Sequence, residues 1–199
     1  MTGSDDTPPR VRARRSDSVR NEALVRSAAS EVFGELGVEL THSAVAARAG
    51  VGRATVYRTF PTRASLIAAM CDDRVAWVRV QLEHALALDD AWLAQVELAH
   101  TLMERLRVDR GLDQVLSPRS EFEAQFAVLE PLFERFLARV KETGRIRPDV
   151  TGIDMGNLMS GLANSLHGRR DDDPASWHRA ADLVLAACGT YPPALGADN

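Results

Sequence analysis

The sequence predicts an all-α protein: an N-terminal three-helix bundle with a helix-turn-helix, followed by a larger helical domain. Apolar residues recur at 3.6-residue spacing through most of the chain after residue 16, and no segment shows the alternation of a strand. Residues 41–63 have the features of two short helices around a glycine-containing turn. With 199 residues, 45 % of them apolar, the chain can bury a core without disulfides or metal ions.

The first helix is expected over residues 17–36, and Gly37 is expected to end it. Residues 1–16 are rich in Pro, Arg, Asp and Thr and lack apolar periodicity, so we expect a disordered tail. Its four arginines are expected to be solvated, with contact to a nucleic-acid backbone as the alternative. The apolar stripe of the helix comprises Val25, Ala28, Ala29, Val32, Phe33 and Leu36.

The most informative segment, THSAVAARAGVGRATVYRTFPTR, spans residues 41–63. Gly50 is expected to end the first short helix in the left-handed conformation, and Gly52 is expected at the N-cap of the second. The second helix then ends abruptly at Phe60-Pro61. Two helices joined in this way form a helix-turn-helix, whose second helix enters the DNA major groove.

Further helices are expected beyond this motif, with a break over residues 109–118. Pro131 lies inside one of them, and its missing N–H and ring clash cost about 3 kcal/mol in an undisturbed helix. We therefore expect a kink or a division at that residue. The expected helical segments are 62–88, 91–108, 119–143, 153–167 and 174–188.

Charge is distributed unevenly along the chain. The net charge is −4, but residues 1–63 hold ten arginines and seven acids, a balance of +3. The remaining residues hold 14 basic and 21 acidic side chains, a balance of −7. A basic N-terminal part on an acidic body favours local attraction to phosphates.

Cysteine content and hydropathy indicate a cytoplasmic protein. Cys71 and Cys188 are isolated in apolar, helix-like surroundings, which predicts reduced core residues. No secretory signal is recognisable. No apolar run approaches the roughly 20 residues needed to cross a bilayer.

From about Arg20 to Leu66 the chain resembles the DNA-binding domain of TetR-family transcriptional regulators. The resemblance rests on Gly37, the AGVG turn and the run TVYRTFPTR that leads into a long helix. A later stretch, GRIRPDVTGIDMGNLMSGL, is similar to the loop and helix start before the family's dimerisation helices. Two departures stand out: Gly52 replaces a frequent serine, and Ala64 and Ser65 replace frequent acids, which is expected to weaken the next helix cap.

The resemblance implies a homodimeric regulator, most often a repressor, that binds a palindromic operator and is released by a small molecule. The expected ligand is largely apolar, and no cofactor or metal is expected. The expected divisions are a tail (1–16), a helix-turn-helix domain (17–62), an effector-binding and dimerisation domain (63–190) and a second disordered tail (191–199).

Side-chain chemistry suggests which residues touch DNA. The Arg53 guanidinium can bond two guanine acceptors, which is worth about 1–3 kcal/mol of discrimination. Arg63 lies in the first turn of a helix, where the macrodipole disfavours a cation by about 0.3–1 kcal/mol. A phosphate bound there would reverse that effect, and the alternative is a solvated surface arginine. The predicted DNA-binding residues are Thr41, Arg53, Ala54, Thr55, Tyr57, Arg58, Thr59 and Arg63.

Two further sets are assigned mainly by the resemblance. Each has an alternative: ordinary core packing for the first set, and packing within the monomer for the second. The candidate effector-pocket residues are Trp77, Trp92, His100, Met103, Phe122 and Phe126. The candidate dimer-interface residues are Met155, Leu158, Met159, Leu162 and Leu166.

Two other classes of protein are alternatives to a DNA-binding regulator. A helical small-molecule-binding protein without DNA recognition is the main alternative, and the basic second helix of the motif argues against it. An enzyme is not expected, because the five histidines show no metal-ligand spacing and the chain has no Gly-rich phosphate loop or nucleophile motif.

Overall fold

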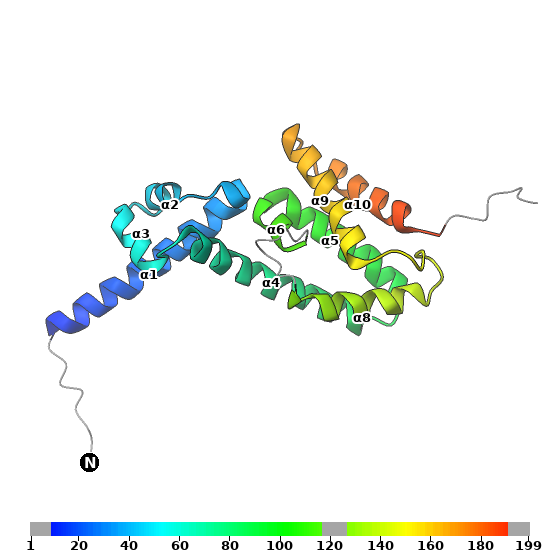
Figure 1. Ribbon diagram of the computed structural model, residues 1–199, viewed down its shortest axis with the longest axis horizontal. Helices are drawn as coiled ribbons and strands as arrows, with labels where there is room; N and C mark the ends of the chain where they lie inside the picture. Colours follow the sequence, from blue (N-terminus) through cyan, green and yellow to red (C-terminus); the bar gives the residue numbers. More distant parts are fainter. Residues whose placement is uncertain (1–8, 117–126, 191–199) are drawn as a thin grey trace, which may run out of the picture.

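The computed structural model describes residues 9–116 and 127–190, with side chains described from residue 20 onward. Its described part is helical apart from loops and an isolated bridge between Ile146 and Gly189. An N-terminal unit lies at one end of the molecule, and a larger helical body lies at the other (Figure 1). The all-α fold class is thereby confirmed.

The N-terminal unit is a small helical bundle. Its first helix begins eight residues before the expected start at residue 17, so residues 9–16 belong to this helix and not to a tail. Gly37 ends it as expected, with a positive φ of 55°. The elements are α1 (Pro9–Leu36), the 3-10 turn η1 (Gly37–Glu39), α2 (His42–Ala49) and α3 (Arg53–Thr59).

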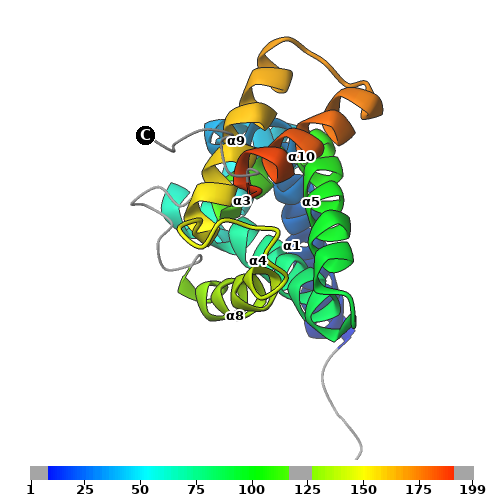
Figure 2. The ribbon, with the colours of Figure 1, turned by 90° about the vertical axis from the view of Figure 1, so that its right-hand side faces the viewer.

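The body is built around α5, which packs against α4, α9 and α10. Figure 2 shows the molecule from the right-hand side of Figure 1. In this view α10 lies between α9 and α5, and α8 lies against α4. No described helix has the length and apolar character needed to cross a bilayer. The elements are α4 (Arg63–Ala87), α5 (Ala91–Val108), the 3-10 turn η2 (Arg110–Leu112), α6 (Asp113–Leu116), α8 (Glu130–Lys141), α9 (Gly152–Gly168) and α10 (Pro174–Cys188).

Apart from the start of α1, the predicted helix bounds agree closely with the described ones, and Pro131 explains the turn at residues 128–129 before α8. Of the expected helix over 119–143, residues 119–126 lie outside the described part. The described helix begins at Glu130, with the proline in its first turn, where a missing N–H costs nothing. The division expected at Pro131 is therefore confirmed.

The cap of α4 is stronger than the sequence suggested. Thr62 Oγ1 accepts from Ser65 N at 3.0 Å, and Ser65 Oγ accepts from Thr62 N at 3.1 Å. This is a capping box, so Ser65 performs the role expected of an acidic residue. The expectation of weak capping was wrong, because a serine hydroxyl accepts the same backbone hydrogen bond.

One buried apolar cluster runs through both parts of the molecule. Phe33 and Phe60 contribute from the N-terminal unit, and Met103 and Trp177 contribute from the body, all at most 3 % exposed. Cys71 and Cys188 are buried and unpaired, as predicted. Burial raises the pKa of the Cys71 thiol to about 11, so it stays protonated and unreactive near neutral pH.

Two glycines of α9 have different surroundings. A Cβ on Gly156 would collide with the backbone carbonyl of Leu116, so this glycine lets α6 approach α9 within one monomer. A Cβ on Gly161 would meet nothing within 4 Å. Gly161 is exposed, so it leaves the outer face of α9 open to close approach by another molecule.

Candidate nucleic-acid interface

Backbone conformation sets the angle between α2 and α3. Thr41 caps α2 as predicted, with its hydroxyl accepting from Ala44 N at 3.1 Å. Gly50 ends α2 at φ 65° and ψ 31°, the left-handed conformation that favours glycine. Val51 packs against the core between the helices, and Gly52 is the N-cap of α3 in extended conformation. These glycines turn the chain sharply and expose the start of α3.

His42 fastens the two helices together, a role that the sequence analysis missed. The ring is 7 % exposed, and its Nε2 donates to the Phe60 carbonyl at the end of α3 over 2.8 Å. The Tyr57 ring stacks on it with centroids 4.1 Å apart and planes 8° from parallel. His42 therefore satisfies a terminal carbonyl of α3 and fixes the ring of Tyr57, which stays 49 % exposed.

The outer face of α3 presents the predicted side chains to solvent. Arg53 is exposed at the first position and has no hydrogen-bond or ion-pair partner within the described residues. Arg58 Nη2 donates to Thr55 Oγ1 at 3.0 Å. Thr59 is half-buried, and its hydroxyl bonds back to the Thr55 carbonyl at 3.4 Å. Arg53 is thus the freest cation of this helix, whereas Thr59 is partly engaged within it.

Arg63 begins α4 but does not remain a free cation. Its Nη2 donates to the Val38 carbonyl in η1. A guanidinium has five N–H donors in all, so this contact leaves others available at an exposed position. The contact holds the arginine beside the N-terminus of α4, and the predicted phosphate contact stays a prediction.

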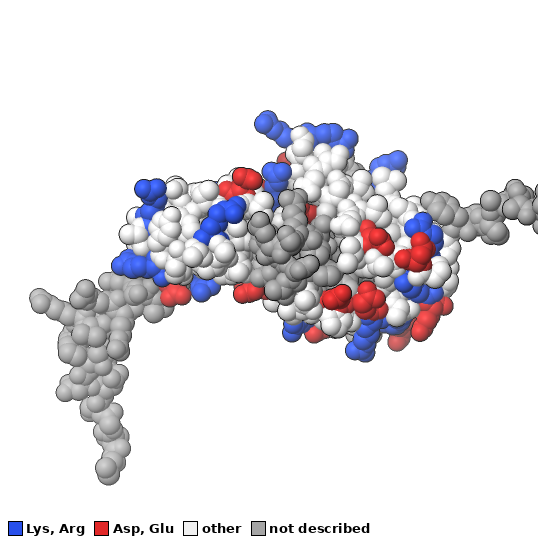
Figure 3. Space-filling view, viewed as in Figure 1, with Lys and Arg blue, Asp and Glu red and all other residues white. Residues whose placement is uncertain are grey.

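Basic side chains project from the end of the molecule that α2 and α3 form (Figure 3). Arg48 differs from the others, because Glu31 and Glu35 of α1 pair with it at 3.1 and 2.7 Å. Its guanidinium lowers the pKa of the Glu35 carboxyl through a side-chain hydrogen bond. Arg48 therefore joins α2 to α1, and within α2, α3 and the first turn of α4 the cations left for a ligand are Arg53, Arg58 and Arg63.

An apolar cavity lies in the body between four helices. The space open to the centre of a water molecule in this cavity is small, about 30 Å³. The lining includes no charged side chain among the described residues. The lining residues are Gln95, Leu98, Ala99 and Leu102 of α5, Leu116 of α6, Phe133, Phe136 and Leu137 of α8, and Gly152, Met155, Gly156 and Met159 of α9.

The four predicted effector residues that the structure describes do not line this cavity. Trp77 and His100 line an open surface hollow, where His100 Nε2 lies 3.0 Å from Asp182 Oδ1. Met103 is fully buried in the core, and Trp92 is half-buried under the Arg145 guanidinium. The remaining two predicted residues, Phe122 and Phe126, lie outside the described part. Aromatic identity alone did not indicate the helix faces that meet at the cavity.

The predicted dimer residues divide between two faces of α9. Met155 and Met159 line the internal cavity, and Leu166 is 5 % exposed. Leu158 is 38 % exposed, and Leu162 lines an outer groove between α9 and α10. Leu158 and Leu162 are therefore on the outer side of α9, together with Leu166, which borders the same groove but is 5 % exposed.

Comparison with known proteins identifies the motif. The family model for bacterial regulatory proteins of the tetR family matches residues 25–70, which span α2, α3 and the start of α4. A TetR transcriptional regulator from Streptomyces coelicolor aligns with 86 % of this chain and 99 % of its own. The TM-score is 0.56 at 26 % identity. Residues 25–70, which contain the helix-turn-helix, are thus similar to the DNA-binding domain of tetR-family regulatory proteins.

Other solved structures share the fold at lower identity. RolR in complex with resorcinol has a TM-score of 0.57 at 20 % identity, covering 88 % of this chain and 91 % of that one. SmeT, the repressor of the Stenotrophomonas maltophilia multidrug efflux pump SmeDEF, has a TM-score of 0.57 at 21 % identity, covering 87 % and 94 %. A search of curated proteins gives no match.

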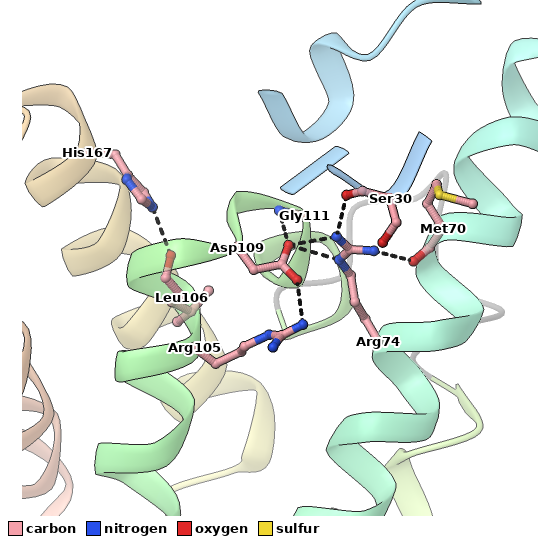
Figure 4. Close-up of polar contacts among 8 residues, drawn as sticks. All are labelled: Ser30, Met70, Arg74, Arg105, Leu106, Asp109, Gly111 and His167. Carbon is pink, nitrogen blue, oxygen red and sulfur yellow. Dashed lines mark hydrogen bonds and ion pairs between the residues drawn. The ribbon is translucent and has the colours of Figure 1, made fainter. Parts of the chain in front are cut away.

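A buried ion pair in the body also contacts the N-terminal unit through its arginine (Figure 4). Arg74 of α4 and Asp109 at the end of α5 are both under 10 % exposed, and Arg74 Nε donates to Asp109 Oδ1 at 2.9 Å. The other guanidinium nitrogens donate to the Met70 carbonyl at 2.8 Å and to the Ser30 carbonyl of α1 at 3.2 Å. One side chain thus connects α1, α4 and α5.

The carboxylate of this pair has further donors. Arg105 Nη2 reaches Asp109 Oδ2 at 3.2 Å, and Gly111 N reaches Oδ1 at 3.1 Å. One turn before the carboxylate, His167 Nε2 donates to the Leu106 carbonyl at 3.0 Å, and partial burial lowers the pKa of this histidine. Because both charged groups have several hydrogen bonds, the pair is tolerated in a low-dielectric interior.

The sequence contained a weak signal for this junction. Arg74 interrupts the apolar stripe of α4, between the buried residues Met70 and Val78. A cation in such a stripe indicates a buried partner. Its partner follows 35 positions later in a region expected to be a break, so sequence spacing did not reveal the pair.

We predict that Asp109→Asn destabilises the protein by about 3–5 kcal/mol, because Arg74 would be left buried without a counter-charge. Asp73→Asn, the same change at an exposed position of α4, should alter stability by less than about 0.5 kcal/mol. Urea unfolding followed by circular dichroism measures both. Equal stabilities for the two variants would contradict a structural role for the pair.

Proposed function

We propose that this protein is a homodimeric transcriptional repressor that binds a palindromic operator and is released by a small, largely apolar ligand. The observation that carries the proposal is the presentation of α3. The helix is exposed at its start, its end is fastened by His42, and Arg53 is left without an internal partner. SmeT, which shares the fold, is a repressor, and we propose the same direction of regulation.

The proposed DNA contacts follow from where each side chain lies. Arg53 at the start of α3 contacts base edges, because its guanidinium can bond two guanine acceptors at once. Tyr57 contacts phosphate, since His42 holds its exposed ring in place. Arg63 and the backbone N–H groups at the start of α4 contact a second phosphate. The other proposed contacts, less directly supported, are Thr41, Ala54, Thr55, Arg58 and Thr59.

The proposed dimer forms through the outer face of α9 and α10. Leu183 of α10 is 47 % exposed and shares a groove with Leu162 of α9. Leu158 lies one turn before Leu162 on α9, and Gly161 adds an open position for close approach. Two helices from each chain would then form a four-helix bundle on a two-fold axis. That axis places two copies of α3 on one DNA duplex.

The proposed ligand site is the apolar cavity between α5, α6, α8 and α9. Its lining is almost wholly aliphatic and aromatic, which favours an apolar ligand. RolR, a protein of this fold, was solved with resorcinol bound, which gives a precedent for a small organic ligand. A ligand can shift the spacing of the DNA-reading helices only by binding one arrangement of the dimer better than the other.

The DNA contacts are tested with single variants on double-stranded DNA selected from a random pool. Arg53→Ala should weaken binding by about 1–3 kcal/mol and relax the base preference at one position of each half-site. Arg63→Ala should weaken binding to all sequences alike. It should also reduce the slope of log K against log salt concentration by about one, as expected for the loss of one phosphate contact. Fluorescence anisotropy at several salt concentrations measures both effects.

Arg135→Ala is the matched control, because this arginine is exposed on α8 in the body. It should bind DNA as the parent protein does. If the Arg53 and Arg63 variants also bind like the parent at every salt concentration, the proposed contacts are wrong.

The dimer is tested by placing a charge on its proposed face. Leu183→Arg should shift the protein toward monomer, because two arginines would be desolvated near the two-fold axis. Leu93→Arg, at a leucine 50 % exposed on α5, should leave the dimer intact. Analytical ultracentrifugation across a range of concentrations gives the dissociation constants. A dimer equally stable in both variants would place the interface elsewhere.

A further inference from the structure

A single polar side chain interrupts the apolar lining of the cavity. Gln95 of α5 is 3 % exposed, and it is the only polar side chain among the described residues that line the cavity. Its amide has no hydrogen-bond partner within the described part of the chain. An amide side chain can donate twice and accept twice, so none of this capacity is used by the described residues.

Packing does not explain this glutamine. The residues three and seven positions later on the same helix face, Leu98 and Leu102, are apolar, buried and part of the same lining. A leucine or methionine would fill the position without the penalty of an unpaired buried amide. Buried glutamine is uncommon and normally hydrogen-bonded, so one that has no partner among the described residues and borders a cavity favours a partner that enters the cavity.

We propose that Gln95 recognises one neutral polar group, a hydroxyl or a carbonyl, on an otherwise apolar ligand. The inference rests on the proposed ligand role of the cavity and adds a chemical class to it. A carboxylate ligand is disfavoured, because no cationic side chain lines the cavity among the described residues. A buried anion without a cationic partner costs far more free energy than an amide hydrogen bond returns.

The proposal predicts a preference opposite to that of simple hydrophobic burial. We choose 4-propylphenol, propylbenzene and 4-propylbenzoate as probes, because they share one skeleton and differ in one group. In a cavity without a hydrogen-bond partner, propylbenzene would bind most tightly, since it loses least on leaving water. With Gln95 as partner, 4-propylphenol should bind at least about tenfold more tightly than propylbenzene, and 4-propylbenzoate most weakly.

The experiment measures binding of the three probes to the full chain by isothermal titration calorimetry. In Gln95→Met, which keeps the length of the side chain, the preference for the phenol should be lost and propylbenzene should bind at least as tightly as before. Gln81→Met is the matched control, because this half-exposed glutamine of α4 does not line the cavity. It should retain the parent's preference. Circular dichroism confirms that both variants are folded.

The outcomes separate the inference from the function on which it rests. If Gln95→Met keeps the phenol preference, or if the parent protein prefers propylbenzene or the benzoate, the assignment of Gln95 is overturned while the cavity stays a ligand site. If none of the three probes binds the parent protein, the ligand role of the cavity falls, and the inference falls with it. Loss of the preference in Gln95→Met alone supports both.

Discussion

The buried pair of Arg74 and Asp109 constrains how the N-terminal unit and the body of this protein can move relative to each other. Its hydrogen bonds reach α1, α4 and α5, and Arg74 also lies over the Phe33 ring of α1 at 4.7 Å. Separating the two charges would leave each one buried without a counter-charge, which costs a large free energy. Any displacement of α4 against α1 must carry this network along or break it. The pair therefore makes the orientation of the N-terminal unit depend on the position of α4 in the body.

At the end formed by α2 and α3, few polar side chains are engaged in contacts that stabilise the fold. Glycine conformations set the turn, His42 holds the end of α3, and Arg48 is neutralised by acids of α1. Arg53, Arg58 and Arg63 are exposed, so a phosphate or a base edge can replace the water around them. At the other end, the cavity lies beside α9, one face of which lines it while the other is open to a second chain.

Local signals in the sequence predicted most of the fold. Caps, glycines and Pro131 act on neighbouring residues, so the helix ends could be placed from short stretches of chain. The features that were missed depend on contacts between distant segments. His42 meets Phe60 across 18 positions and Arg74 meets Asp109 across 35, and neither pairing follows from spacing. The cavity lining likewise depends on how four helices meet, so the sequence did not reveal that Trp77 and Trp92 lie outside it.

The central claim is that two copies of α3 read one DNA duplex together. Hydroxyl-radical footprinting of the protein on duplexes selected from a random pool tests this directly. If two copies of α3 bind one duplex, two protected half-sites related by a two-fold axis are expected. Their centres should be one or more helical turns apart, each turn being about 10–10.5 base pairs. Selection that recovers no common sequence, or protection spread evenly along the duplex, would contradict it.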